Sequence, residues 1–253
     1  MKRVVVIIVV LACAILAGAA EVARPSHPEL LQGAKSIDNT VQLEEWVTFY
    51  YLHPRPELTE SAWKRMVQEK LFSREDLRPG LISFYAGLFR REPSLSLKLV
   101  PEVHDPDSRL TLASAVWLSN VDNAVDVIDA ISKGATSDEK STLKDMAYRT
   151  PPDIATKPIV TEWNLDELWG TFFATGTDMY VEKISSTLAW TSDPDPVRRS
   201  IAQEAHRTLV SNGVGHPRVL KICEAALSHA TNPQKDALAA VLTEAREQAN
   251  RTR

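Results

Sequence analysis

The fold class follows from LASAVWLSNVDNAVDVI (residues 112–128) and LWGTFFATGTDMYVEKI (residues 168–184), whose first residues are 56 positions apart. A third stretch, FYAGLFRREPSLSLKLV (residues 84–100), begins half that distance before the first one. In all three stretches, bulky apolar residues recur at spacings of three and four, which is the period of one helix face. A polar turn interrupts each stretch near its middle. We therefore predict three helix–turn–helix units that form an internal repeat.

The turns of the proposed repeat lie at residues 92–94, 120–122 and 176–178. Each turn contains a residue suited to cap the second helix, namely Ser94, Asp122 and Asp178. Without a true repeat, the same pattern still predicts a pile of αα-hairpins, so both interpretations give one fold class. Each first helix also carries two adjacent small residues that would let a neighbouring helix approach closely: Ala86 and Gly87, Ser114 and Ala115, and Gly170 and Thr171.

Helical patterns continue on both sides of the repeat. Asp-Pro at residues 195–196 and Asn-Pro at residues 232–233 are typical helix starts, whereas Ser-Asn-Gly at residues 211–213 predicts a helix end. Three prolines predict an irregular connector near residues 149–163. We predict an all-α protein of about ten helices. These helices would form stacked αα-hairpins, an irregular α-solenoid-like array over residues 41–253, after a flexible tail at residues 21–40.

Residues 1–20 have the pattern of a secretory signal peptide. Lys2 and Arg3 precede an uncharged apolar run, which ends in small residues just before Glu21. Cleavage after residue 19 or 20 would deliver the mature protein to the periplasm or the exterior. Two alternatives stay open: the apolar run is just long enough for an uncleaved membrane anchor, and the residues before Cys13 loosely resemble a lipoprotein signal.

The charge of the chain narrows the class of partners that it could bind. The formal net charge is −4, or −6 without Lys2 and Arg3, and no block of basic residues offers a surface to nucleic acid. We therefore expect no nucleic-acid partner, and a membrane contact only through an uncleaved or lipidated N-terminus.

Removal of residues 1–20 would leave Cys223 as the single cysteine. Its place on an apolar helix stripe predicts a buried thiol, with a reactive or intermolecular thiol as the alternative.

The sequence contains no recognisable catalytic or cofactor-binding motif. It lacks the nucleophile elbow GxSxG, the phosphate-binding loop GxxxxGK[ST] and a GxGxxG that follows a strand. The six histidines form no paired metal-ligand pattern, and the acidic turn at residues 104–107 is better explained as a helix cap than as part of a metal site. We expect no metal, no cofactor and no enzymatic activity.

Aromatic residues indicate where a partner would bind. Trp169 and Tyr85 occupy the same position in the proposed repeat, and Trp169 lies at the edge of the apolar stripe of its helix. If one face of each ring stays accessible, the two rings are anchors for a protein or peptide partner. The alternative is that both rings belong to the core, as aromatic residues at helical spacing usually do.

Two segments resemble those of uncharacterised exported bacterial proteins that are all-helical: WGTFFATG (residues 169–176) and YYLHPRPELT (residues 50–59). The resemblance spans roughly residues 41–190. It implies an envelope protein built of αα-hairpins, and it brings no activity and no functional residues. The leading hypothesis is an exported scaffold that binds a protein or peptide. The alternatives are a hydrolase-like enzyme on a helical scaffold and a membrane-anchored structural component of the envelope.

Overall fold

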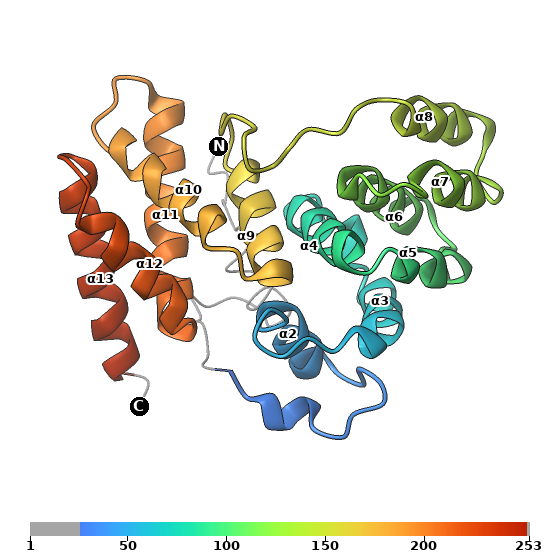
Figure 1. Ribbon diagram of the computed structural model, residues 1–253, viewed down its shortest axis with the longest axis horizontal. Helices are drawn as coiled ribbons and strands as arrows, with labels where there is room; N and C mark the ends of the chain where they lie inside the picture. The colour runs from blue at the N-terminus through green and yellow to red at the C-terminus, as the bar shows by residue number, and fades with distance from the viewer. Residues whose placement is uncertain (1–25, 252–253) are drawn as a thin grey trace, which may run out of the picture.

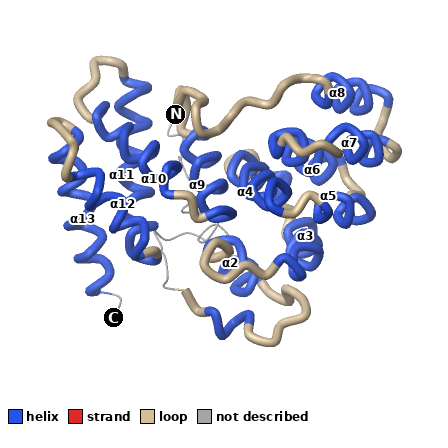
Figure 2. Tube along the Cα trace, viewed as in Figure 1, coloured by secondary structure: helices blue, strands red, loops and turns tan. Residues whose placement is uncertain are grey.

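The computed structural model describes residues 26–251, and every regular element in this range is a helix (Figures 1 and 2). The predicted all-α fold class is confirmed. No helix of this range combines the length and the apolar composition needed to cross a bilayer. The range holds twelve α-helices: α2 (Thr40–Thr48), α3 (Thr59–Gln68), α4 (Arg78–Arg91), α5 (Ser94–Leu99), α6 (Pro106–Ser119), α7 (Ala124–Ser132), α8 (Ser137–Ala147), α9 (Trp163–Thr175), α10 (Asp178–Ser186), α11 (Pro196–Gly215), α12 (Pro217–Leu227) and α13 (Gln234–Arg251). It also holds short 3₁₀-helices: η1 (Pro28–Leu31), η2 (Pro56–Leu58), η3 (Leu71–Ser73), η4 (Val100–Glu102) and η5 (Thr187–Trp190).

Each unit of the proposed repeat is a helix pair, with its turn where the sequence predicts it: α4 leads to α5, α6 to α7, and α9 to α10. The predicted caps are wrong. Ser94 and Asp178 are already the first residues of their helices, Asp122 lies outside α7, and none of the three starts has a side-chain cap. Two of the turns are instead set by the end of the first helix, because Asn120 and Gly176 adopt left-handed φ angles of 54° and 68°.

Small residues let α4 and α9 touch along their backbones. A Cβ atom at Gly170 would lie 2.1 Å from the carbonyl oxygen of Gly80, and one at Gly87 would lie 2.6 Å from the Cβ of Ala174. The close approach predicted from the small residues is therefore confirmed for this pair of helices. Because α4 also packs against α6, it lies between α6 and α9, near the centre of the molecule (Figure 1).

Helix α11 begins as expected but ends later than predicted. Asp195 caps α11 by accepting a hydrogen bond of 2.9 Å from the backbone N–H of Val197. The predicted helix end at residues 211–213 is wrong, since α11 continues past it. A Cβ atom at Gly213 would lie 2.7 Å from the Cδ2 of Leu220 on α12. This glycine therefore provides room for a neighbouring helix and does not end its own.

A packed lead-in, residues 26–39, precedes α2. The sequence predicts a flexible tail at residues 21–40, and the structure differs over the part that it describes. The side chains of Leu31 and Ile37 are buried in the core, and the guanidinium of Arg55 donates a hydrogen bond of 2.7 Å to the carbonyl of Leu31. Apolar burial and this bond fix the lead-in to the helices. The predicted signal peptide lies outside the described residues.

An irregular connector, residues 148–162, joins α8 to α9 where the prolines predict it, and it crosses the molecule between the two helices (Figure 1). Lys183 on α10 holds this connector, because its ammonium group donates hydrogen bonds of 3.0 and 2.8 Å to the carbonyls of Ile154 and Ala155. The connector therefore reaches α9 in a defined position, with its last residues beside the start of α11.

Candidate functional site

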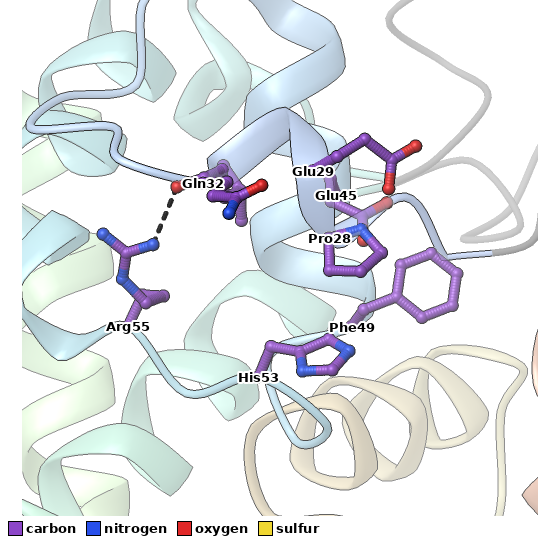
Figure 3. A pocket seen from close by; sticks show the side chains of 8 residues that line it. Pro28, Glu29, Gln32, Glu45, Phe49, His53 and Arg55 are labelled. Carbon is purple, nitrogen blue, oxygen red and sulfur yellow. Dashed lines mark hydrogen bonds between the residues drawn. The ribbon is translucent and has the colours of Figure 1, made fainter.

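A cavity of about 460 Å³ lies beneath the lead-in (Figure 3). Its walls come from η1, from α2 and from the loop that follows α2. The side chains that line it mix apolar, acidic and basic groups: Pro28, Glu29, Leu31, Gln32, Glu45, Phe49, His53 and Arg55.

The charged groups of this cavity fasten the lead-in to the helices. One carboxylate oxygen of Glu45 accepts hydrogen bonds of 2.7 Å from the Ser26 hydroxyl and 2.9 Å from the His27 backbone N–H. Figure 3 shows the bond from Arg55 to the Leu31 carbonyl at the opposite side of the cavity. Both charges are thus explained by the attachment of the lead-in, so this cavity is not our candidate for partner binding.

The two aromatic residues predicted to bind a partner, Trp169 and Tyr85, are both fully buried. The Trp169 ring stacks on Phe173 with ring centres 5.7 Å apart, and the Tyr85 ring meets Trp63 edge to face at 5.0 Å. The Tyr85 hydroxyl donates to the sulfur of Met66. The expectation that one face of each ring stays accessible is wrong, because both rings lie where helices pack together.

An exposed tryptophan lies six residues before Trp169. The side chain of Trp163, at the first position of α9, is 55% exposed, and those of Val160 and Val197 beside it are 61% and 52% exposed. Together they border a groove of about 440 Å³ between the connector, the start of α9 and the start of α11. We call it the Trp163 groove, and it is lined by Val160, Thr161, Glu162, Trp163, Pro196, Val197, Ser200 and Ile201.

Local hydrogen bonds fix the connector side of the groove. The spacing of Asn164 and Glu167 predicts a capping box at the start of α9. In the structure Asn164 lies inside the helix instead, and its side chain is bonded to the connector. Its side-chain oxygen accepts bonds of 3.0 and 3.1 Å from the backbone N–H groups of Val160 and Thr161, and its amide donates to Glu167. Because these groups are tied, Trp163 projects from a fixed backbone.

Carboxyl groups extend from the groove into the interior between α9 and α11. Glu162 accepts a hydrogen bond from the Ser200 hydroxyl across the groove. One turn further along α9 lies Asp166, which is fully buried and has no hydrogen-bond partner for either carboxylate oxygen among the described residues. One turn after Ser200 on α11 lies Glu204, which is also buried and is bonded to Arg207 at 2.9 Å.

Burial governs the ionisation of Asp166 and Glu204. It raises the pKa of Asp166 well above its usual range, and the neighbouring charge of Glu204 raises it further, whereas Arg207 has the opposite effect. The pKa of Glu204 is raised as well, chiefly by burial, although its bond to Arg207 offsets part of this effect. Asp166 is therefore a buried carboxyl group that binds a proton readily.

A second buried polar group lies at the other end of the same pair of helices. His216, between α11 and α12, stacks on Phe173 with ring centres 5.4 Å apart, and its ring centre lies 4.5 Å from that of Phe49 in a tilted contact. Its Nδ1 lies 3.0 Å from the Tyr51 hydroxyl. Burial lowers the pKa of His216 to about 3. A neutral imidazole in an aromatic cage is well suited to join helices and is not open to a ligand.

The other polar groups that the sequence singles out have roles in the fold and do not form a site. Asp105, in the acidic turn at residues 104–107, caps α6 in a capping box with Ser108, as predicted. Cys223 is buried, and burial raises its pKa to about 12, which keeps the thiol protonated. Within residues 26–251, no three His, Cys, Asp or Glu side chains are placed to hold a metal ion together.

Sequence reasoning missed Trp163 although it found the right helix. The signal was available, because Trp163 falls off the stripe formed by Leu165, Leu168 and Phe172, all of which are buried. An aromatic residue outside the apolar stripe and next to an irregular connector is a better candidate for exposure than one at the edge of the stripe.

Comparison of the chain with protein-family models, curated proteins and solved structures finds no match. The candidate site therefore depends on its geometry alone.

Proposed function

We propose that this chain is an exported helical scaffold that binds a protein or peptide partner through the Trp163 groove. The observation that carries the proposal is the exposure of Trp163, since Trp46, Trp63 and Trp169 are fully buried. A large ring and two valine side chains in contact with water lose apolar surface when a partner covers them, which favours binding. Tryptophan is also enriched, with tyrosine and arginine, at the energetic centre of protein interfaces.

Rigid walls support the proposal. The groove is bounded by the tied connector and by the capped first turn of α11, so little order has to be created on binding. In our proposal the helix pairs form an irregular solenoid-like array, which presents an extended surface of this kind.

The export part of the proposal is supported by the N-terminal sequence and by the resemblance to exported helical proteins. We expect the mature chain to start at Ala20 or Glu21, in the periplasm or outside the cell. N-terminal sequencing of protein from the cell envelope tests this, and an intact Lys2–Arg3 end would support the membrane-anchored alternative.

Site-specific photo-cross-linking in the native envelope tests the groove. A benzophenone amino acid at position 163 should form a discrete adduct with a partner, whereas the same group at position 148 should not. Tyr148 is a matched control because it is 70% exposed, aromatic and outside the groove. The adduct should disappear when Val197→Asp places a charge in the groove. Equal adducts at both positions, or an adduct that survives Val197→Asp, would reject the groove as the binding surface.

A further inference from the structure

We infer that the Trp163 groove receives a basic side chain of the partner, arginine above all, with its aliphatic stem along Trp163 and Val197 and its cationic end at Glu162. The inference rests on the proposed function and names the chemistry that the partner presents. Three observations support it: the carboxylate of Glu162 has no basic partner among residues 26–251, further carboxyl groups lie below it, and an aromatic residue lies beside it.

Glu162 is the acid of the groove wall, and it has no counter-ion in the part of the chain that the structure describes. One of its oxygens accepts the bond from Ser200, and no described lysine, arginine or histidine forms an ion pair with it. The nearby acids differ, since Glu167 is paired with Lys157 at 2.8 Å and Glu204 is paired with Arg207. A half-buried carboxylate in an apolar groove attracts a cation more strongly than one in open water.

The buried carboxyl group of Asp166 lies close enough to Glu162 to interact with its charge. Asp166 is influenced by the charges of Glu162, Glu167 and Glu204, and Arg207 is the basic group that acts on it. The carboxyl oxygens of Asp166 have no hydrogen-bond donor among residues 26–251. A cation placed at Glu162 would favour ionisation of Asp166, so the buried group would reinforce the attraction once the groove is filled.

The apolar part of the groove suits the rest of an arginine side chain. Its methylene groups pack on apolar surface while its charged end reaches a carboxylate, as basic side chains do at many protein surfaces. The Trp163 ring offers a face on which a planar guanidinium stacks, and tryptophan is the strongest of the aromatic residues in such contacts. A norleucine side chain would gain the apolar contact alone.

The test compares three peptides that differ at one position: acetyl-Ala-Ala-Xaa-Ala-Ala-amide with arginine, citrulline or norleucine as Xaa. Citrulline keeps the length and planar end of arginine without its charge. Binding to the full chain is followed by NMR through the indole N–H signal of Trp163, which Trp163→Phe assigns. The arginine peptide should bind at least about fivefold more tightly than the citrulline peptide.

Variants then identify the carboxylate that distinguishes the arginine peptide from the citrulline peptide. Glu162→Gln should remove the preference for arginine, whereas Glu182→Gln, an exposed acid on α10, should leave it unchanged. Asp166→Asn should reduce the preference about twofold, with folding checked by the dispersion of the NMR spectrum. High salt should weaken the binding of the arginine peptide and leave the binding of the other two peptides unchanged. This measurement needs no variant.

Each failure has a distinct meaning. Equal binding of the three peptides, or an arginine preference that survives Glu162→Gln, overturns the inference and leaves the groove as an apolar binding surface. If no peptide shifts the Trp163 signal while the cross-linked adduct at position 163 still forms, the inference is again overturned and the proposed function stands. If no adduct forms at position 163 in the otherwise unchanged chain, the proposed function itself is rejected.

Discussion

The backbone of Gly170 lies directly against the carbonyl group of Gly80, so α9 and α4 meet without an intervening side chain. This contact places α9 at the centre of the molecule, with α4 on one side and α10 and α11 towards the other (Figure 1). Because Trp163 is the first residue of α9, the position of the groove depends on this helix contact.

Gly170→Ala should therefore destabilise the protein by about 3 kcal/mol, because the new methyl group collides with backbone that cannot move aside. Gly134→Ala is the matched control. Its Cβ would meet a terminal side-chain nitrogen of Arg109, at 3.2 Å, and no backbone atom within 4 Å, so the expected change is below about 1 kcal/mol. Urea unfolding followed by circular dichroism measures both, and similar values for the two variants would contradict the close contact.

The second prediction concerns Phe173 and Trp117, which occupy the same position in the proposed repeat. Both are expected from the sequence to be buried, but only Phe173 is; Trp117 is partly exposed, and its indole donates a hydrogen bond of 2.7 Å to the carbonyl of Arg149. Phe173→Ala should cost about 3–5 kcal/mol, and Trp117→Ala clearly less. A larger loss for Trp117→Ala in denaturant unfolding would reverse this assignment.

The third prediction separates the two tryptophans of α9. Trp169→Ala should lower the melting temperature strongly, since it leaves a cavity in the core that corresponds to about 3–5 kcal/mol. Trp163→Ala should change the free energy of unfolding by less than about 1 kcal/mol, because its ring already contacts water. Calorimetry of the two variants measures both changes in stability. A large loss of stability in Trp163→Ala would show that this residue is part of the core.

The helices could be predicted because their signals are local. Apolar residues at helical spacing predict each helix pair of the proposed repeat, and Asp-Pro predicts the start of α11. The errors occurred where a distant contact outweighs a local preference. Gly213 has the sequence signal of a helix end, yet it lies within α11 because Leu220 of the next helix packs against it. Neither Leu220 nor its distance can be inferred from local spacing.

The candidate site could be predicted less well for the same reason. The sequence predicts Trp169 itself as an aromatic anchor, but exposure depends on which faces of α9 meet the neighbouring helices, and Trp169 is fully buried. The pairing of Glu162 with Ser200 joins residues 38 positions apart, and no motif connects them. The buried Asp166 reads in the sequence as an ordinary polar residue of the first helical turn.

The fourth prediction concerns acid sensitivity through His216. Burial lowers its pKa to about 3, so the folded protein holds it neutral while the unfolded chain protonates it near its usual value. The stability that it contributes is complete above about pH 6.5 and is lost as the pH falls towards 3. His216→Phe, which keeps an aromatic ring in the cage, should reduce this loss, whereas His229→Phe on the exposed surface should not. Urea unfolding between pH 7 and 4 compares them; an unchanged acid slope in His216→Phe would show that other groups cause it.

Asp166 should have the opposite dependence on pH. Its pKa is raised in the folded protein above the ordinary value of 3.8, so the folded state binds a proton that the unfolded state releases. The stability linked to this proton is complete below about pH 4 and is lost as the pH rises through the raised pKa. Asp166→Asn, which has nearly the same shape and cannot ionise, should flatten the fall in stability above pH 4 and raise the free energy of unfolding at pH 8 by at least about 1 kcal/mol. Asp145→Asn on the exposed face of α8 serves as the control and should leave the profile unchanged. Urea unfolding at several pH values from 4 to 8 measures the slope, and a less stable Asp166→Asn protein at pH 8 would mean that the ionised carboxylate has a stabilising partner.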